Sequence, residues 1–491
     1  MSYLYNRRTF LKTSAALTAA TAWPLRSVFG AGAGESLPLL AVRKKQPALV
    51  RGAFFYPPAE VVEAGQCEDN WSQHKWFTWP GNQFAPADQQ AKFMDRLRAM
   101  TADLDLTLAM DEESIYTDAA VAAFIAEIQN QATRPDALLL INFYNSFSRK
   151  IVPILDAYDG PIILYHAVGA NHQLPPERFR TEPRLYYIHS IENFEALERG
   201  LRAVHARTRL AQSRLLRVSG RVQNQTDEQE PFFGTQVRSI PAEEYNSLFD
   251  ETNCTPALER LGEQVRAGAT EVRELSNKAF RDGVCAHAAV LEIMNRHEAD
   301  AITIECLFLK HRKPCLSFAI NNGALTPCGC ENDLNATLTL MLGAGLFGRG
   351  GFQHNPEFDT EENRYFGAHC TCATKLHGPA GPDAPYMLRP FFHQPPKTLA
   401  LDVQWPEGEP ATLCKYHSGK KVLDAWRGRV VSSPKCPPTG GCATRVLVEI
   451  DGVDDVCSIY HGPHPVLFCG DFARHLEVFA QLYGLEIRTN A

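Results

Sequence analysis

The pattern of hydrophobic and polar residues changes character along the chain. Over the first two thirds, short apolar runs alternate with amphipathic stretches of helical period. The run ALLLINF at Ala137–Phe143 is almost entirely apolar, which is typical of a strand buried on both faces of a parallel sheet. This alternation predicts parallel sheets with helices on both faces. We expect strands at Ala53–Tyr56, Leu104–Met110, Ala137–Phe143, Ile162–Tyr165, Leu185–Ile188, Leu215–Val218, Ala301–Cys306 and Cys315–Ala319, and helices at Gln89–Met100, Ala119–Gln131, Ser190–Ala206 and Pro256–Asn295.

Beyond Gly378 the pattern becomes one of short β-type runs separated by Pro and Gly. Such runs predict a mostly antiparallel barrel or sandwich. An amphipathic helix is expected to close the chain at Asp471–Tyr483, ending before Gly484. The β-type runs are Leu399–Val403, Thr412–Tyr416, Arg445–Ile450, Val456–Tyr460 and Val466–Phe468.

The chain is too long for one domain. We expect an α/β protein in which two parallel α/β domains, residues 34–165 and 166–340, are followed by a β-rich domain, residues 341–491. Residues 1–33 are set apart, because NRRTFLK and the run TSAALTAATAWPL have the pattern of a twin-arginine export signal. The small residues Ala31-Gly32-Ala33 predict cleavage there, export by the twin-arginine machinery and a periplasmic or other extracytoplasmic location. A basic N-terminal arm on a cytosolic protein is the alternative.

Charge and hydropathy exclude some classes of partner. Residues 1–33 contain four basic residues and no acid, so their removal takes the formal net charge from −7 to −11. An acidic mature chain without a basic block argues against nucleic acid or an anionic membrane as partner. No run after the signal is apolar enough to span a membrane, so stable membrane insertion is not expected.

The 14 cysteines allow a disulfide interpretation in an exported protein. Cys306 and Cys315 lie inside apolar runs, which favours buried free thiols. Cys436 and Cys442, in a loop rich in Pro and Gly, are the best disulfide candidates.

Candidate chemistry is concentrated between Ala299 and Cys372 and near the C-terminus. Glu305 and Glu331 stand at the ends of apolar strand-like runs, and His369 follows an acidic loop. His461 and His464 occur close together in YHGPHPVLFCGD. Carboxylates and imidazole together form a ligand set for a divalent cation such as Mn²⁺ or Mg²⁺. As an alternative, Glu331 could simply cap a helix that begins near Asp333.

Three motifs carry a resemblance to a known family. CENDLNATLTLMLGAGLFG, NRYFGAHC and HPVLFCGDFARHLEVFAQLYGLEI, together with TQVRSIPAEEYNSLFD at Thr235–Asp250, resemble the L-fucose isomerase and L-arabinose isomerase superfamily. The resemblance covers residues 235–372 and 455–488, and the chain looks like a distant, exported branch. The family fold has two flavodoxin-like α/β domains and a β-rich C-terminal domain, with the metal between the second and third.

The resemblance implies a metal-dependent enzyme that interconverts an aldose and a ketose through an enediol. The implied metal ligands are Glu305, Glu331, His369 and His464, and the metal is Mn²⁺ or another divalent cation such as Mg²⁺, Fe²⁺ or Co²⁺. Pro465 departs from the His-His pair of the family, so His461 is a possible substitute for His464. Glu305 and Glu331 would transfer the protons. Asp333, Lys310, Asp359 and Asn363 would contact the substrate or the ligands. A homotrimer or homohexamer is implied, with a neighbouring N-terminal domain closing the site.

Other interpretations stay open on the sequence alone. The same metal site could epimerise, dehydrate or cleave a sugar derivative, or the chain could bind carbohydrate without turning it over. In a third class, Cys-Gly-Cys at 328–330 and Cys-Thr-Cys at 370–372 would form a thiolate zinc or iron–sulfur site. Their Cys-x-Cys spacing matches no standard cluster pattern.

Overall fold

The computed structural model describes residues 39–68, 74, 85–144, 147–168, 174–437 and 440–490. The expected export signal, residues 1–33, lies outside the described residues. Contacts divide the chain into two compact units. Unit 1 comprises Gln46–Thr208 with Gln481–Tyr483, and unit 2 comprises Arg209–Ala480 with Gly484–Ala491 and the described residues 39–45.

Unit 1 is a parallel α/β sheet of five strands in the order β2-β1-β3-β4-β5. This is the flavodoxin-like order, in which the chain reverses direction across the sheet between β1 and β3. The expected helix Ala119–Gln131 is confirmed as α5, and the Thr117 side chain caps it by accepting the Ala120 amide. The elements are β1 (Ala48–Phe55), α2 (Ala59–Glu63), α4 (Pro86–Leu104), β2 (Leu106–Met110), α5 (Asp118–Asn130), β3 (Ala137–Asn142), α6 (Ser148–Ala157), β4 (Ile162–Ala167), α7 (Glu177–Thr181), β5 (Leu185–Ser190) and α8 (Phe194–Ala211).

The first sheet of unit 2 repeats this order. Its parallel strands lie in the order β8-β6-β10-β11, and β7 pairs antiparallel with β8 at the edge. The elements around it are β6 (Arg214–Ser219), β7 (Thr226–Gln229), β8 (Gln236–Pro241), α9 (Ala242–Glu251), α10 (Pro256–Gly268), β9 (Glu271–Val272), α11 (Asn277–Arg296), β10 (Ala301–Ile304), α12 (Cys315–Gly323), β11 (Cys328–Cys330) and α13 (Leu334–Phe347), with 3-10 helices at Cys306–Phe308 and Lys310–Arg312.

The C-terminal part of unit 2 is β-rich, as expected. An eight-stranded sheet runs β12-β20-β17-β18-β19-β14-β13 with β21 against β18, and a smaller sheet runs β16-β15-β9. All pairs of the larger sheet are antiparallel except β18 with β21. The elements are β12 (Phe352–Gln353), β13 (Asn355–Asp359), β14 (Arg364–His369), β15 (Tyr386–Pro390), β16 (Leu399–Val403), β17 (Pro410–His417), β18 (Val422–Ser432), β19 (Thr444–Ile450), a 3-10 helix (Val456–Ile459), β20 (Val466–Cys469), α14 (Ala473–Tyr483) and β21 (Glu486–Thr489).

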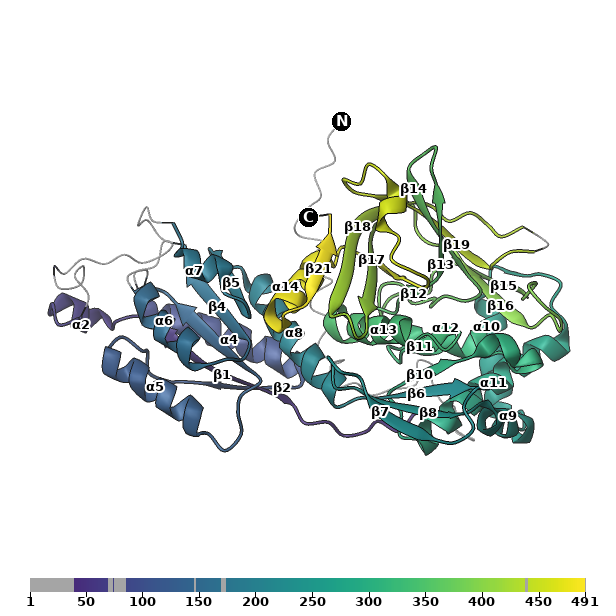
Figure 1. Ribbon diagram of the computed structural model, residues 1–491, viewed down its shortest axis with the longest axis horizontal. Helices are drawn as coiled ribbons and strands as arrows, with labels where there is room; N and C mark the ends of the chain where they lie inside the picture. Colours follow the sequence, from purple (N-terminus) through teal and green to yellow (C-terminus); the bar gives the residue numbers. More distant parts are fainter. Residues whose placement is uncertain are drawn as a thin grey trace. The chain divides into compact units, whose positions relative to one another are not determined.

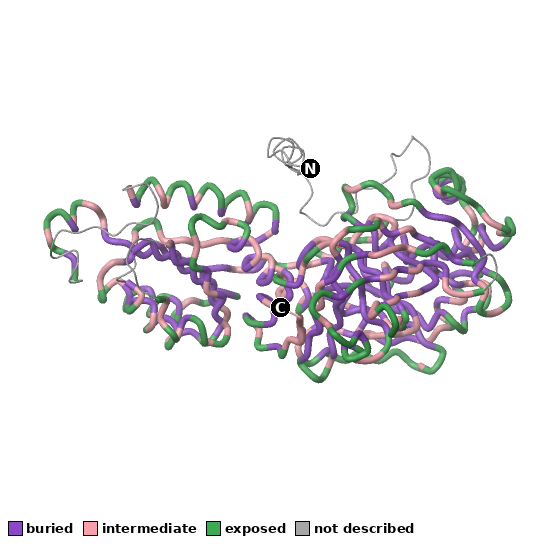
Figure 2. Tube along the Cα trace, turned by 90° about the horizontal axis from the view of Figure 1, so that it is seen from above, coloured by how far each residue is buried: buried purple, intermediate pink, exposed green. Residues whose placement is uncertain are grey.

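Helices α12 and α13 lie between the parallel sheet and the C-terminal strands of unit 2 (Figure 1). Both are buried along almost their whole length. Figure 2 shows buried backbone throughout the interior of unit 2. The strand expected at Cys315–Ala319 is therefore wrong, since this run is the start of α12. A helix covered on all sides has no polar face, so its short apolar run resembles a buried strand.

Two further expectations need correction. The strand expected at Val456–Tyr460 is a 3-10 helix, begun by Asp455, whose side chain accepts the Cys457 amide. The long helical pattern at Pro256–Asn295 is two helices, α10 and α11, separated by β9. The contacts divide the chain near Thr208, and the domain boundaries expected near residues 165 and 340 lie within β4 and α13.

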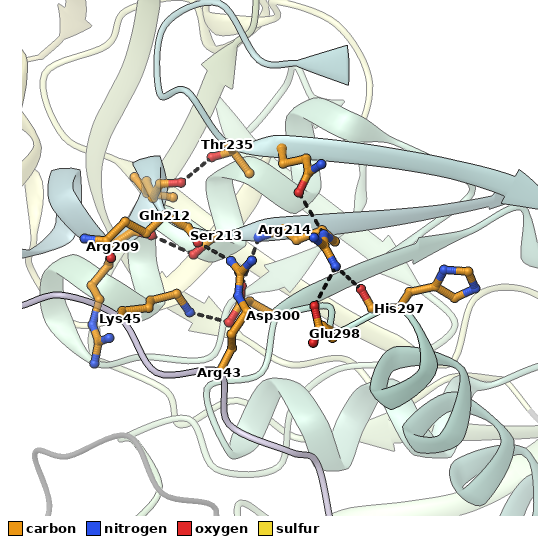
Figure 3. Close-up of polar contacts among 12 residues, drawn as sticks. Arg43, Lys45, Arg209, Gln212, Ser213, Arg214, Thr235, His297, Glu298 and Asp300 are labelled. Atoms are coloured by element: carbon orange, nitrogen blue, oxygen red, sulfur yellow. Dashed lines mark hydrogen bonds and ion pairs between the residues drawn. The ribbon is translucent and has the colours of Figure 1, made fainter. Parts of the chain in front are cut away.

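The described residues 39–45 belong to unit 2, where basic side chains tie them to Asp300 (Figure 3). Arg43 and Lys45 both pair with the Asp300 carboxylate, which also accepts the Arg214 amide at 2.9 Å. Asp300 immediately precedes β10. The contact therefore holds this segment at the amino end of the parallel sheet, and leaves the carboxyl end open for chemistry.

No helix in the described ranges combines the length and apolar character needed to cross a membrane.

Candidate metal centre

Three side chains from separate elements of unit 2 converge at the carboxyl end of its parallel sheet. Glu331 follows β11, His369 ends β14, and His464 lies just before β20. One ligand atom from each lies within 4.8 Å of the other two. The Glu331 carboxylate is 3.4 Å from Nε2 of His369 and 3.6 Å from Nε2 of His464. One carboxylate and two imidazoles are a ligand set for a divalent ion.

Glu331 is held in a tight turn between β11 and α13. Glu331 and Asn332 both have left-handed backbones, with φ of 60° and 57°. The Asn332 amide donates to the Ile304 carbonyl at 3.1 Å, and its side chain accepts from Arg217 at 3.2 Å. A left-handed conformation is uncommon for a residue such as Glu and costs about 1–3 kcal/mol. Strain of this kind is concentrated at functional sites, and here it orients the carboxylate.

His464 is oriented by a carboxylate behind it. Its Nδ1 lies 2.9 Å from Oδ2 of Asp333, which leaves Nε2 facing Glu331. Asp333 is also the N-cap of α13, since its side chain accepts the Ala336 amide at 2.8 Å. Capping thus belongs to Asp333 and not to Glu331. A carboxylate that fixes the far nitrogen of a histidine is a common support for a metal ligand.

His369 has one engaged nitrogen and one orphaned nitrogen. Its side chain is 1% exposed, and Nδ1 lies 3.4 Å from Sγ of Cys370. Nε2 is buried and has no hydrogen-bond partner, although it faces the Glu331 carboxylate. A buried polar atom without a partner costs free energy. A metal ion bound at Nε2 would satisfy it, so these residues fit such an ion.

The electrostatics of the site favour the forms that bind metal. The contact with His369 lowers the pKa of the Glu331 carboxyl. Burial opposes ionisation of Asp333, but hydrogen bonds from His464 and from the Ala336 amide outweigh it and lower its pKa. Burial also lowers the pKa of His369. Near neutral pH the site therefore presents ionised Glu331 and neutral His369, the forms that coordinate a cation.

The centre opens into a pocket of about 520 Å³ above the first turn of α13. This size suits a small molecule. The lining is mostly polar, and backbone N–H groups at the start of a helix add hydrogen-bond donors. The pocket is lined by Glu331, Asn332, Asp333, Leu334, Asn335, Ser418, Pro463 and His464.

Glu305 lies beside the centre but outside the three-residue group. It directly follows β10, whose Ile304 pairs with Cys330 of β11, so Glu305 and Glu331 follow neighbouring strands. Its Oε2 accepts from Ser219 Oγ at 2.7 Å and from the Gly220 amide at 3.0 Å. Its Oε1 pairs with Arg221 at 3.1 Å, an arginine whose side chain is 83% exposed. Glu305 therefore stands at the point where the strand order reverses, between β6 and β10.

Two other candidates have structural contacts of their own. Asp359 ends β13, and its Oδ1 accepts the amides of Glu361 and Glu362 in the hairpin turn. Asn363 donates to the Val453 carbonyl and accepts the Val456 amide. Both side chains brace turns of the C-terminal sheet. Their polarity in the sequence reflects turn chemistry.

Lys310 and His461 also differ from the cluster residues in their surroundings. Lys310 is exposed in a 3-10 helix, and its carbonyl accepts from Lys313. His461 lies 3.2 Å from Asp424, which also accepts from His417 at 2.7 Å. Of the two C-terminal histidines, His464 is the one brought to Glu331.

Two positioning residues were missed in the sequence. Gln353 of β12 donates to the Cys330 carbonyl and accepts the Cys330 amide, so it fixes the residue before Glu331. The His354 amide donates to the Pro465 carbonyl, next to His464. The two adjacent residues therefore brace both ligand loops. Their polarity within a short buried segment after Gly350-Gly351 was the available signal.

The structure tests the two expectations about cysteine pairing. Cys436 and Cys442 do not form the disulfide suggested for them, whereas the buried thiols expected at Cys306 and Cys315 are confirmed. Cys330, His369 and Cys370 make a second group whose ligand atoms lie within 4.8 Å of one another. Buried clusters of this chain can thus hold a metal ion through carboxylate, imidazole or thiol donors.

Comparison with known proteins identifies the export signal alone. Residues 5–22 match the model of the twin-arginine translocation pathway signal sequence, so the chain is exported by that machinery. No curated protein matches the chain.

Proposed function

We propose that the mature chain is a divalent-metal-dependent isomerase that acts on a sugar or sugar derivative outside the cytoplasm. The convergence of Glu331, His369 and His464 beneath an open polar pocket is the observation that carries this proposal. The resemblance of the CEND and AHC motifs to the sugar isomerase superfamily supports the same residues.

Within this proposal, the ion is bound by Glu331, His369 and His464. Two imidazoles favour Mn²⁺, Fe²⁺ or Co²⁺ over Mg²⁺, which prefers oxygen ligands. When bound, the metal would polarise two neighbouring oxygens of the open-chain sugar. Asp333 would keep the His464 ring in place, and Asn335 and Ser418 of the pocket would meet substrate hydroxyls.

Glu305 is proposed as the carboxylate that transfers the proton, rather than as a ligand. Its Oε2 is fixed by Ser219 and Gly220, which suits a base that must keep one orientation. One proton leaves the carbon beside the carbonyl and is returned to the former carbonyl carbon. A second proton moves between the two oxygens, so the net reaction moves two hydrogens within one molecule.

A second reaction at the same site is favoured by one observation. Arg221 pairs with Glu305, and its side chain is mostly exposed. Its guanidinium group is therefore available to bind a carboxylate on the substrate. An acidic sugar would then be dehydrated, epimerised or cleaved. A scaffold that binds carbohydrate without turnover would show neither reaction.

Elemental analysis with a substrate screen tests the proposal. The mature protein, purified with Mn²⁺, is expected to hold about one ion per chain and to convert at least one aldose, ketose or sugar acid. Glu331→Gln should lose the ion and all turnover while circular dichroism stays unchanged. Glu361→Gln, an exposed acid in the β13–β14 turn, is the matched control and should behave as the parent. A fully active Glu331→Gln variant would contradict the site.

The assembly implied by the resemblance, a homotrimer or homohexamer, belongs to the same proposal. Light scattering coupled to gel filtration measures it directly. A monomer that retains full activity would remove the role of a neighbouring chain in closing the site.

A further inference from the structure

A row of four buried cysteines lies immediately behind the candidate metal centre. This thiol row comprises Cys306, Cys315, Cys330 and Cys370, each at most 7% exposed. Cys306 and Cys330 pack in one buried cluster and Cys315 and Cys370 in another, and the ligand atoms of Cys330 and Cys370 lie within 4.8 Å of each other. The four come from four separate segments, namely the 3-10 helix after β10, the start of α12, the end of β11 and the residue after β14.

The other halves of the two Cys-x-Cys motifs have different neighbours. Cys328 is buried against Asn321, and Cys372 against Trp405 and Cys469. Cysteines commonly pack as small apolar residues, and that description suits these two. In the thiol row, by contrast, four polarisable sulfurs are gathered in one place by the tertiary fold.

A buried cation faces the thiol row. Lys313 is 3% exposed, donates to the Lys310 carbonyl at 3.1 Å and lies over the Phe391 ring at 5.2 Å. Its electrostatic neighbours include the thiols of Cys315, Cys306 and Cys370, and no carboxylate among the described residues forms an ion pair with it. Burying an ammonium group without an anion is costly. Negative charge on the sulfurs would supply the missing partner.

The row also adjoins a histidine shared with the first centre. Nδ1 of His369 lies 3.4 Å from Sγ of Cys370, and the ligand atoms of Cys330, His369 and Cys370 are all within 4.8 Å. The opposite nitrogen of the same ring faces Glu331. A donor set of sulfur with one imidazole, closed to solvent, is typical of soft metals.

We propose that the thiol row is a second, closed metal site that binds a thiophilic ion, Zn²⁺ or Cu⁺, through Cys330, Cys370 and at least one flanking thiol. Each thiol that binds gives its proton to solvent, and no electron is transferred. Three thiolates around Zn²⁺ carry one net negative charge, which the Lys313 ammonium neutralises, and three around Cu⁺ carry two, of which Lys313 neutralises one. The role of this ion is to fix the strand end and loop that carry Glu331 and His369. It does not depend on the reaction assigned to the first centre.

Cobalt replacement tests the second site, because thiolate-bound Co²⁺ has an intense near-ultraviolet charge-transfer absorption that carboxylate-bound Co²⁺ lacks. The mature protein, produced in a cobalt-supplemented medium, is expected to hold two ions and to show this band. Glu331→Gln should lose one ion and keep the band. The double variant Cys330→Ser, Cys370→Ser should lose the band, whereas Cys328→Ser and Cys372→Ser are matched buried controls and should keep it.

The parent spectrum decides the question even where the double variant does not fold. Cobalt protein without a sulfur band, in which all four thiols react with a thiol reagent on unfolding, would overturn the proposal. Metal analysis of protein produced with zinc or with copper then distinguishes the two ions. Failure of Glu331→Gln to turn over substrate, with the band intact, concerns the first centre alone.

Discussion

The two parallel sheets share a strand order but differ in the residues that come after their strands. In unit 1, aromatic rings fill the place between β1 and β3 where the strand order reverses. The ring centroid of Phe143 lies 5.6 Å from that of Phe54 and 5.9 Å from that of Tyr56. In unit 2, the corresponding place between β6 and β10 is polar, since Ser219 and Gly220 donate hydrogen bonds to Glu305. The same topology therefore gives a packed core in one case and a candidate site in the other. Strand order provides the crevice, and the residues after the strands decide its chemistry.

Histidines show the same contrast. His166 near the end of β4 is surrounded by Tyr187 and His189. His369 and His464 face a carboxylate, and they come from the C-terminal sheet rather than from the parallel sheet itself. The candidate metal centre of unit 2 thus combines a carboxylate from the parallel sheet with two imidazoles from the C-terminal sheet. Within the described residues, unit 1 has no group of three such ligands.

The largest expected effect is the loss of catalysis when Glu305, between β6 and β10, is changed. Glu305→Gln keeps the shape and one oxygen for Ser219 but cannot accept a proton, so kcat should fall about 10²–10⁴-fold. Metal content should stay at the parent value, in contrast to Glu331→Gln. Steady-state kinetics on the substrate found by the screen, with elemental analysis, makes the comparison. A variant that loses its metal instead would return Glu305 to the ligand set.

The aromatic rings between β1 and β3 of unit 1 should matter for stability only. Phe143→Ala removes a ring that is 2% exposed and packs against Phe93 at 5.1 Å, so the free energy of unfolding should fall by about 3–5 kcal/mol. Phe308→Ala, at a side chain 71% exposed, is the control and should change it little. Denaturant unfolding measures both. Loss of metal on Phe143→Ala, in protein that stays folded, would show that unit 1 supports the centre.

Acid should weaken both units through buried histidines. Burial lowers the pKa of His166 in unit 1 to about 3 and that of His287 in unit 2 to about 4, from 6.5. Below 6.5 the unfolded chain binds a proton that each folded unit excludes, so stability falls as pH drops toward the folded pKa and is unaffected above 6.5. Each histidine contributes up to about 1.4 kcal/mol per pH unit.

Hydrogen exchange of the metal-free protein follows the two units separately. His166→Gln should flatten the pH dependence of unit 1 alone, and His287→Gln that of unit 2 alone. Equal flattening of both units by either variant would mean that they unfold as one.

The smallest expected effect concerns the support of His464. Asp333→Asn keeps a cap for α13 but replaces the carboxylate behind Nδ1, so metal affinity should fall about 10–100-fold with the fold intact. Competition with a chelator measures the change. Asn335→Asp, on the same helix and in the same pocket, adds charge without touching His464 and should not lower metal affinity. Unchanged affinity in Asp333→Asn would show that His464 needs no support.

Local patterns in the sequence determined much of this protein. The apolar runs predicted the parallel strands, the Pro- and Gly-rich region predicted the β-rich end, and the paired arginines predicted export. The family resemblance implied Glu305, Glu331, His369 and His464 as ligands, and the last three of these converge. These features depend on neighbours in the chain, which a sequence displays directly.

Tertiary structure alone decided the rest. The run at Cys315–Ala319 is a helix because two sheets cover it, and Glu305 is held by Ser219 because β6 lies beside β10. Asp359 and Asn363 brace turns of the C-terminal sheet, and four cysteines gather in the interior only because four segments converge. Such contacts join residues far apart in the chain, so their partners are set by packing and not by local pattern.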